Sequence, residues 1–314
     1  MSRIVIPRDR ILVMDGAMGT MIQEYAGRFE GNCDMLNLRS PEVVGRIHRE
    51  YIEAGADIIE TNTFNSNSIS QSEYGLVDKA ADMAYAGASI ARKVADAYAL
   101  SGRKIYVAGS VGPTSVSLSM ASDADNPGHG QYDFDAMSAA YRQQMEALIK
   151  GGVDVILIET CVDVLNTKAA LCALSWLYPQ MDFPVMVSVS VGDCGGRTFA
   201  GHTLEAFYSA VKHYPLLSFG LNCSFGSDGM ISLMREVASF AECAVSCCPN
   251  AGLPDETGEY DGTPEKMAAD MLSMAREGLL NIAGGCCGTT PEHIRAMAEA
   301  LKGVPPRPCV LSAQ

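Results

Sequence analysis

Eight short apolar runs recur along the sequence, and they limit the possible folds more than any other feature. Each run is rich in Val, Ile or Leu and is apolar throughout rather than at alternate positions. Continuous apolar runs of this length are typical of strands buried on both faces, as in parallel sheets. The runs begin near Ile11, Asp57, Lys104, Asp154, Pro184, Leu216, Ala244 and Asn281.

Helical periodicity fills several of the segments between these runs. In residues 41–56, for example, Val44, Ile47 and Tyr51 fall on one helical face, with Pro at the start and Gly near the end. Alternation of strand and helix predicts an α/β fold, a (β/α)8 TIM barrel, rather than a doubly wound sheet. The count leaves a seven- or nine-stranded variant open. Similar helical patterns cover residues 202–213, 229–242, 263–278 and 290–303.

The 314 residues contain no composition break that would mark a second domain. An α/β barrel commonly uses about 250 residues as one unit. We therefore expect residues 1–303 to form one barrel domain and the Pro-rich residues 304–314 to form a linker. The polar, aperiodic segment 115–135 is long for a connection in a compact domain, which is typical of a functional loop.

Charge and cysteine usage exclude several classes of function. With 23 Lys and Arg against 37 Asp and Glu, the net charge of −14 disfavours nucleic acid and anionic membranes as partners. The N-terminal residues 1–10 lack the apolar core of a secretory signal, and no apolar stretch is long enough to span a membrane. We expect a cytoplasmic protein whose eleven cysteines stay reduced.

Polar and metal-capable residues follow the ends of most of the apolar runs. Barrel enzymes carry their reactive groups at these C-terminal strand ends, so we expect the side chains to meet at one mouth of the barrel. A buried carboxylate is costly unless something binds it, which favours function over packing. These residues are Asp15, Glu60, Thr61, Asn62, Glu159, Thr160, Asn222, Cys223, Cys248, Asn250, Cys286 and Cys287.

The segment GGCCGTT is the most informative of these strand ends. Neighbouring side chains of a regular strand face opposite ways, so Cys286 and Cys287 need a turn to reach one centre, and the glycines around them would permit one. Cys223, after another strand, would complete a set of three thiolates. Three cysteines around Zn²⁺ leave the fourth position open, as in catalytic sites. The alternative is that these cysteines are small buried residues.

A zinc ion held by three thiolates is a weak Lewis acid, which suits deprotonation of a substrate thiol and hence alkyl transfer to sulfur. Asp15 and Glu159 would suit an amino group on that substrate, and main-chain amides from Gly16 to Gly19 would suit its carboxylate. We place Asn62 in the same substrate site. Two alternatives remain open. Residues 15–20 could form a simple turn, and Glu60 and Glu159 could pair with a buried Lys or Arg.

The other cysteines, the histidines and the methionines carry weaker signals. None of the five histidines has ligand spacing to a second histidine, and His129 falls in the long polar loop. Met267, Met271 and Met274 have helical spacing and are interpreted as core. The cysteines interpreted as packing or exposed thiols are Cys33, Cys161, Cys172, Cys194, Cys243 and Cys309.

Several motifs together resemble the homocysteine S-methyltransferase barrel. They are DGAMGTMIQ, SPEVVGRIHREYIEAGADIIETNTFNS, GGVDVILIET, GLNCSFG, PNAGLPDETGEYD and GGCCGTTPEHI, and they run in the family's order from about Ile11 to Lys302. The chain is most similar to the N-terminal, homocysteine-binding module of cobalamin-dependent methionine synthases.

This resemblance implies an enzyme that methylates homocysteine to methionine. It implies zinc on Cys223, Cys286 and Cys287, with Asn250 as a fourth ligand when substrate is absent, and it assigns Asp15 and Glu159 to the substrate amino group. The donor implied is methylcobalamin, presented by cobalamin-binding and methyltetrahydrofolate-binding domains in the same or another chain. Donation by betaine or S-methylmethionine is an alternative, and a non-enzymatic metal or thiol protein on a barrel scaffold is another.

Two features depart from the family pattern. Full-length methionine synthases of this type continue into further domains, and no histidine here lies in the D-x-H-x-x-G signature of a cobalamin ligand. We therefore expect either an excised module or a subunit whose donor arrives on another protein. In addition, Cys247 and Cys248 lie just before the strand-end residue Asn250, where Cys248 could approach the metal or an oxidised partner.

Overall fold

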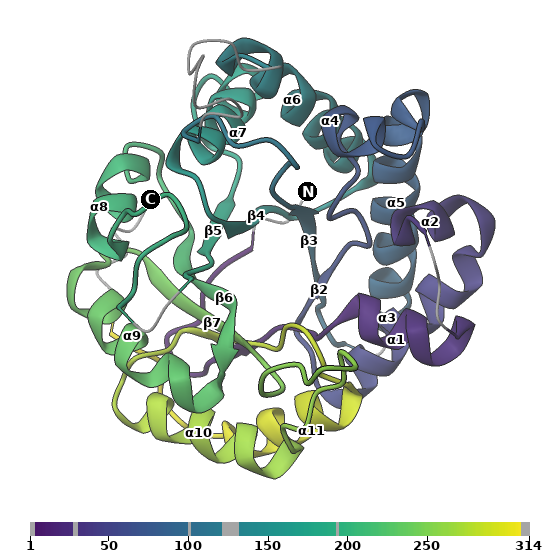
Figure 1. Ribbon diagram of the computed structural model, residues 1–314. Coiled ribbons are helices and arrows are strands. Elements are labelled where there is room, and N and C mark those ends of the chain that lie inside the picture. Colours follow the sequence, from purple (N-terminus) through teal and green to yellow (C-terminus); the bar gives the residue numbers. More distant parts are fainter. Residues whose placement is uncertain (1–3, 28–30, 100–101, 121–131, 193–194, 309–314) are drawn as a thin grey trace.

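Eight parallel strands form a nearly closed barrel with helices around it in the computed structural model (Figure 1). The model describes residues 4–27, 31–99, 102–120, 132–192 and 195–308. Each strand coincides with one of the apolar runs, so the predicted fold class and the count of eight are confirmed. The strands are β1 (Leu12–Val13), β2 (Ile58–Glu60), β3 (Tyr106–Val111), β4 (Val155–Cys161), β5 (Val185–Val189), β6 (Ser218–Gly226), β7 (Ala244–Asn250) and β8 (Ile282–Ala283).

Strand pairing brings all the carboxyl ends of the strands to one mouth. The hydrogen-bonded order is β1-β8-β7-β6-β5-β4-β3-β2, with every pair parallel. Between β1 and β2 the ring is completed by a bridge from Met14 to Ile58, with Asp15 N donating to Ile58 O at 3.0 Å. Residues that follow the strands therefore share one end of the barrel.

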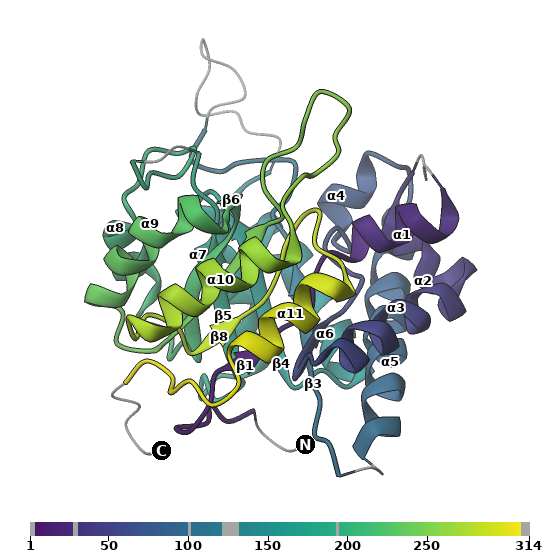
Figure 2. The same ribbon diagram turned by 90° about the horizontal axis from the view of Figure 1, so that it is seen from below.

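Helices cover the outside of the barrel, and their ends follow the predicted capping residues (Figure 2). Thr263 accepts a hydrogen bond from Lys266 N with Pro264 in the first turn, and Thr290 forms a capping box with His293. The longer helices are α1 (Met18–Ala26), α3 (Pro41–Ala54), α5 (Ala80–Ala99), α6 (Phe134–Gly151), α7 (Val164–Leu177), α8 (Leu204–Val211), α9 (Ser227–Phe240), α10 (Pro264–Arg276) and α11 (Pro291–Ala300). Shorter helical turns are η1 (Cys33–Met35), α2 (Leu36–Arg39), α4 (Ser68–Ser72) and η2 (Val77–Lys79).

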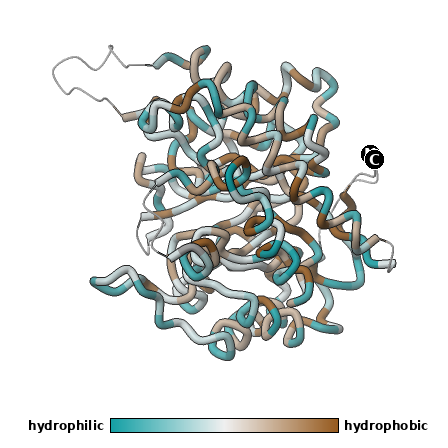
Figure 3. The backbone as a smooth tube through the Cα atoms, turned by 90° about the vertical axis from the view of Figure 1, so that its right-hand side faces the viewer, coloured by the Kyte–Doolittle hydropathy of each residue, from teal (hydrophilic) through white to brown (hydrophobic). Residues whose placement is uncertain are grey.

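The apolar interior has two layers, one between strands and helices and one inside the barrel. Figure 3 shows hydrophobic stretches alternating with hydrophilic ones along the chain. Strand alternation assigns side chains to these layers, so Cys247 packs towards the helices and Cys248 inside the barrel. Ile4 and Ile6 also belong to the inner layer, where they pack with residues of the strands. The methionines of residues 267–274 are buried, as predicted.

Two predicted segments differ in detail from the structure. The polar connection predicted for residues 115–135 ends earlier, because α6 begins at Phe134 with Asp133 as its N-cap. Residues 121–131 of that connection, with His129, lie outside the described residues. In the predicted tail, Arg307 donates to the main-chain oxygens of Ala238 and Ala241 at 3.0 and 2.7 Å, so its first residues contact the barrel. No helix in the described ranges is long and apolar enough to cross a membrane.

Candidate metal centre

Three cysteine sulfurs meet at the mouth of the barrel. The Sγ atoms of Cys223, Cys286 and Cys287 all lie within 4.8 Å of one another, and Cys223 Sγ is 3.5 Å from Cys287 Sγ. Cys223 belongs to β6, while the other two follow β8, so residues separated by about a fifth of the chain converge. The structure thus brings together the three thiols singled out in the sequence.

The cysteine pair lies in a turn beyond β8 rather than on the strand. Thr289 donates to Cys286 O from its main-chain nitrogen at 3.1 Å and from its hydroxyl at 2.7 Å. Gly288 has φ +78°, which L side chains rarely adopt. The turn frees both thiols from the strict alternation of a strand.

The two glycines before the cysteine pair do not have the role expected of them. Gly284 and Gly285 are not among the residues with positive φ. A Cβ on Gly284 would lie 2.7 Å from Met14 Cβ, and one on Gly285 would lie 2.5 Å from Thr289 Oγ1. These positions are restricted to glycine because other segments approach closely, so the prediction that glycine dihedrals turn the chain there is wrong for both.

Backbone strain directs the ends of β4 and β6. Thr160 and Cys223 have φ of 55° and 54°, in the left-handed region that non-glycine residues rarely occupy. Strand pairing is irregular at both places. Asn222 fastens the two ends together, since its Oδ1 accepts from Thr160 N at 3.0 Å and its Nδ2 donates to Thr160 Oγ1 at 2.8 Å.

Asn250, at the end of β7, lies opposite the cysteine pair. Its neighbours Pro249 and Ala251 bond to the main chain of Cys286 and Cys287 at 2.8 and 2.9 Å. Asn250 is 6% exposed, and its Oδ1 has no hydrogen-bond partner among the described residues. A buried oxygen without a partner requires an explanation. Three sulfurs with one such oxygen nearby form a donor set that fits a tetrahedral zinc ion.

Three carboxyl groups lie at the same end of the barrel. Asp15 and Glu159 are 2% and 7% exposed, and the partly buried Glu60 is the last residue of β2. Asp15 Oδ2 accepts from Glu60 N at 3.0 Å, Asp15 Oδ1 has no partner in the described chain, and Ser110 donates to Glu159. None of the ion pairs between described residues involves these groups, so the structure does not support pairing with a buried Lys or Arg.

Burial raises the pKa of all three carboxyl groups. The pKa of Glu159 rises to about 7 because of desolvation, and those of Asp15 and Glu60 lie well above their usual range for the same reason. The charge of Glu159 adds to the effect on the other two. A positively charged group entering this space would relieve the cost of three buried acids.

A narrow cavity connects the carboxyl groups with the thiols. It has a volume of about 20 Å³, enough for about one water molecule. Glu60, Glu159, Asn222 and Cys286 contribute to its lining. Two of the three acids, Glu60 and Glu159, and one of the three sulfurs therefore face one common space.

Hydrogen bonds among the thiols favour one thiolate in the cluster. Bonds from Cys223 and Cys286 lower the pKa of Cys287 to about 3, and the same contacts raise that of Cys286 well above its usual range. Cys248 lines the same small cavity as Cys286 but does not belong to the set of three clustered thiols found among the described residues. It is buried inside the barrel, where desolvation and the charge of Glu60 raise the pKa of its thiol.

The remaining predicted site residues have defined neighbours. A Cβ on Gly16 would lie 2.6 Å from Thr289 Oγ1, so the segment after Asp15 packs against the turn that carries the cysteine pair. Asn62 donates to Cys33 O at 2.9 Å and to Asn37 Oδ1 at 3.2 Å. Its amide thus holds the loop after β2 to η1 and α2.

Sequence reasoning missed two residues of the site. Ser110 donates a hydrogen bond to Glu159, and the side chain of Tyr260 interacts with the Cys287 sulfur. Thr160, which the sequence did place at the end of its strand, carries the strained backbone. Ser110 lies on β3, an apolar run from which no site residue was selected. Tyr260 lies in a quoted motif, but its distance in sequence from Cys287 gave no signal of contact.

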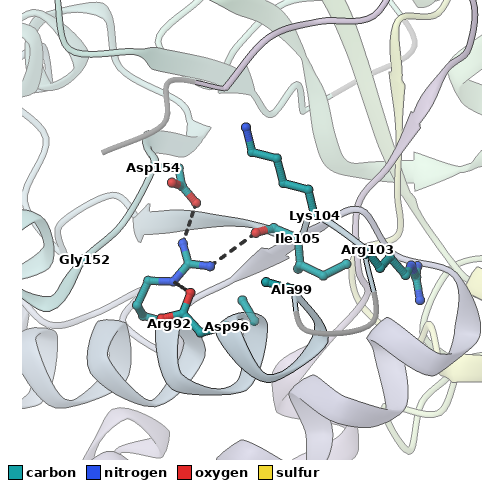
Figure 4. A pocket seen from close by; sticks show the side chains of 10 residues that line it. Arg92, Asp96, Ala99, Arg103, Lys104, Ile105, Gly152 and Asp154 are labelled. Carbon is teal, nitrogen blue, oxygen red and sulfur yellow. Dashed lines mark hydrogen bonds and ion pairs between the residues drawn. The ribbon is translucent and has the colours of Figure 1, made fainter.

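A larger cavity, of about 630 Å³, lies at the opposite end of the barrel (Figure 4). It is lined by residues that precede β3 and β4. Its basic groups are already engaged, since Arg92 Nη1 contacts Asp154 Oδ2 at 2.8 Å and Arg103 donates to the main-chain oxygens of Ile52 and Ala56. This cavity contains none of the predicted site residues.

Comparisons with known proteins identify a matching family and similar folds. The model of the homocysteine S-methyltransferase family matches residues 12–301. The oxidized form of the homocysteine methyltransferase MmuM from Escherichia coli is similar in structure, with a TM-score of 0.75 and 22% identity over 92% of this chain and 95% of that chain. Its metallated form gives a TM-score of 0.73 and 24% identity over 93% and 96%. At this identity the two structures establish the shared fold.

Proposed function

The chain belongs to the homocysteine S-methyltransferase family, and from this premise we propose that it transfers a methyl group to the thiol of homocysteine, giving methionine. The observation that carries the proposal is that three cysteine sulfurs and buried carboxyl groups lie at one mouth of the barrel. No ion pair between described residues neutralises these carboxyl groups. One set of groups suits a thiol held on a metal, and the other suits an ammonium group. Homocysteine carries both.

Cys223, Cys286 and Cys287 would hold Zn²⁺, with Asn250 Oδ1 as the fourth ligand when substrate is absent. The partnerless Asn250 oxygen supports this assignment. A bound Zn²⁺ would lower the pKa of a coordinated substrate thiol, so that the sulfur is a thiolate at neutral pH. The protein's part is to hold the three sulfurs together, through the turn after β8 and the strained end of β6.

Asp15 and Glu159 would bind the ammonium group of homocysteine. Their raised pKa values reflect burial without a cation, and an ammonium group would supply one. The carboxylate of the substrate would lie near Gly16, where α1 begins with no side-chain cap and its first amides are available. Because the cavity is small, entry requires movement of lining side chains such as Met14 and Met186.

The methyl donor would be methylcobalamin, presented by a cobalamin-binding domain that acts with a methyltetrahydrofolate-binding domain, in the same chain or another. Support comes from the sequence motifs, which are most similar to the homocysteine module of cobalamin-dependent methionine synthases. Asn62 remains a predicted member of the substrate site, although its amide is engaged in holding the loop after β2.

The experiment combines the zinc-loaded protein, homocysteine and free methylcobalamin, and follows the cobalamin spectrum together with methionine formation. Homocysteine-dependent loss of methylcobalamin, with one methionine formed for each, is the expected result. If methionine formed from betaine or S-methylmethionine without any cobalamin, the proposed donor would change and homocysteine would remain the acceptor. No methionine from any of these donors, with zinc bound, would contradict the proposed reaction.

A further inference from the structure

The connection between β7 and α10 forms a hairpin over the mouth of the barrel. Pro254 and Tyr260 pair in an antiparallel bridge, and Asp255 Oδ1 accepts from the main-chain nitrogens of Thr257 and Glu259 at 2.8 and 2.9 Å. Figure 2 shows this loop rising above α10 and α11. Every residue from Leu253 to Glu259 is exposed, and Tyr260 is the first that is partly buried.

The base of the hairpin is fixed to the barrel on both sides of this residue. Gly262 N donates to Ala251 O at 2.9 Å, and Gly262 O lies 2.8 Å from His293 Nε2 on α11. Ala251 N in turn donates to Cys287 O at 2.9 Å. The backbone around Tyr260 is therefore tied to the segment that carries the cysteine pair.

The ring of Tyr260 packs directly on the turn after Cys287. A Cβ on Gly288 would lie 2.3 Å from the Cγ atom of the ring and 2.5 Å from Tyr260 Cβ, so only glycine leaves room for this contact. This packing holds the Tyr260 side chain beside Cys287, the residue before Gly288, and Tyr260 interacts with the Cys287 sulfur.

We propose that Tyr260 is a positioning residue of the metal centre, whose hydroxyl donates a hydrogen bond to the Cys287 sulfur while its ring fastens the hairpin over the cysteine turn. The inference rests on the proposed function, because it takes Cys287 to be a metal ligand. A hydrogen bond to a thiolate withdraws electron density from the sulfur. Groups that contact ligands in this way orient them and tune the metal.

This role differs from simple packing in one measurable respect. A packing role depends on the ring, which Tyr260→Phe retains, whereas the proposed role depends on the hydroxyl. In Co²⁺-substituted protein, loss of the hydrogen bond would raise the energy of the sulfur lone pairs. The sulfur-to-cobalt charge-transfer band of Tyr260→Phe would then shift to longer wavelength.

The test titrates Co²⁺ into wild type, Tyr260→Phe and the control Tyr85→Phe, and records the absorption spectra without homocysteine or methyl donor. Tyr85 is 51% exposed on α5, so its variant should match wild type. The expected result for Tyr260→Phe is the band shift, with metal affinity about 10-fold weaker in competition with a chromophoric chelator. Far-UV circular dichroism checks the fold, and Tyr260→Phe that folds but binds no Co²⁺ supports the proposal.

An unchanged band position and unchanged affinity in Tyr260→Phe, with wild type binding one Co²⁺, would overturn the role of Tyr260 and leave the proposed function standing. Wild type that binds no Co²⁺ would overturn both. Because the spectra require no turnover, failure of the methyl-transfer assay would not affect this result.

Discussion

The two ends of the barrel differ in the groups that they bury. At the N-terminal end, the inner layer is apolar, with Leu12, Ile58 and Ile282 at most 1% exposed. At the other end, polar groups are buried without partners, and two non-glycine residues, Thr160 and Cys223, have left-handed backbone. Both ends belong to the same strands.

This difference separates the end of the barrel that stabilises the fold from the end that carries the functional groups. Apolar burial at the N-terminal end contributes free energy of folding, while unpaired carboxyl groups and backbone strain at the mouth reduce it. Strain and unsatisfied polar groups persist where the surrounding structure is rigid enough to hold them. Apolar burial at the N-terminal end thus offsets the free energy that the groups at the mouth cost.

The largest effect is expected from removing a sulfur at the mouth. Cys286→Ser should lower zinc affinity by at least about 100-fold and reduce methyl transfer in proportion, since a ligand contributes more than the groups around it. The free energy of unfolding without metal should change little. Cys172→Ser, on α7, is the matched control. Full zinc content and full activity in Cys286→Ser would remove the basis of the comparison.

A substitution at the N-terminal end should show the reverse pattern. Ile282 is fully buried in the inner layer, so Ile282→Ala should cost about 2–5 kcal/mol in the free energy of unfolding, and Ile282→Val about 0.5–1.5 kcal/mol. Zinc content per folded molecule should be unchanged. Denaturant unfolding, followed by fluorescence, measures the first quantity. If these Ile282 variants kept full stability but lost zinc, stability and metal binding could not be assigned to different ends of the barrel.

Substitution of a carboxyl group at the mouth should have a smaller effect, and it should raise the stability of the fold rather than lower it. Burial raises the pKa of Glu60 above its value in the unfolded chain, so the folded protein holds that proton more tightly and loses stability as pH rises from about 4.5. Glu60→Gln removes this titration. Its melting temperature should exceed that of wild type at pH 8 by about 2 °C for each kcal/mol recovered, and should match it at pH 4.

Equal melting temperatures of wild type and Glu60→Gln at pH 8 would mean that the charge of Glu60 costs the folded protein no stability. Glu73→Gln, at an exposed position directly after α4, serves as a control for the loss of one negative charge. Added homocysteine should narrow the difference between wild type and Glu60→Gln, because the ligand's ammonium group offsets the buried charge.

The sequence allowed prediction of the regular half of the barrel and of the thiols. Runs such as the one in residues 154–159 are mostly apolar because both faces of the strand are covered. This requirement can be read directly from the amino acids of the run. The three cysteines could be grouped because parallel strands place their carboxyl ends together. Family resemblance then gave the same residues.

The remaining features depend on contacts between distant segments. Thr160 and Cys223 have left-handed backbone, and Thr160 is bonded to Asn222 of another strand, a contact that no local sequence preference predicts. Gly284 is required by Met14, some 270 residues earlier in the chain, and Tyr260 reaches Cys287 across a hairpin. That Cys248 could approach the metal stays a prediction, since its side chain lies in the inner layer and lines the same small cavity as Cys286.

The most direct test of the account is X-ray absorption at the zinc edge, measured on the zinc-loaded protein before and after addition of homocysteine. The account predicts a shell of three sulfurs, from the three cysteines, and one lighter atom, which becomes four sulfurs when homocysteine binds. A zinc shell that stays the same with saturating homocysteine would contradict the claim that this mouth activates the substrate thiol.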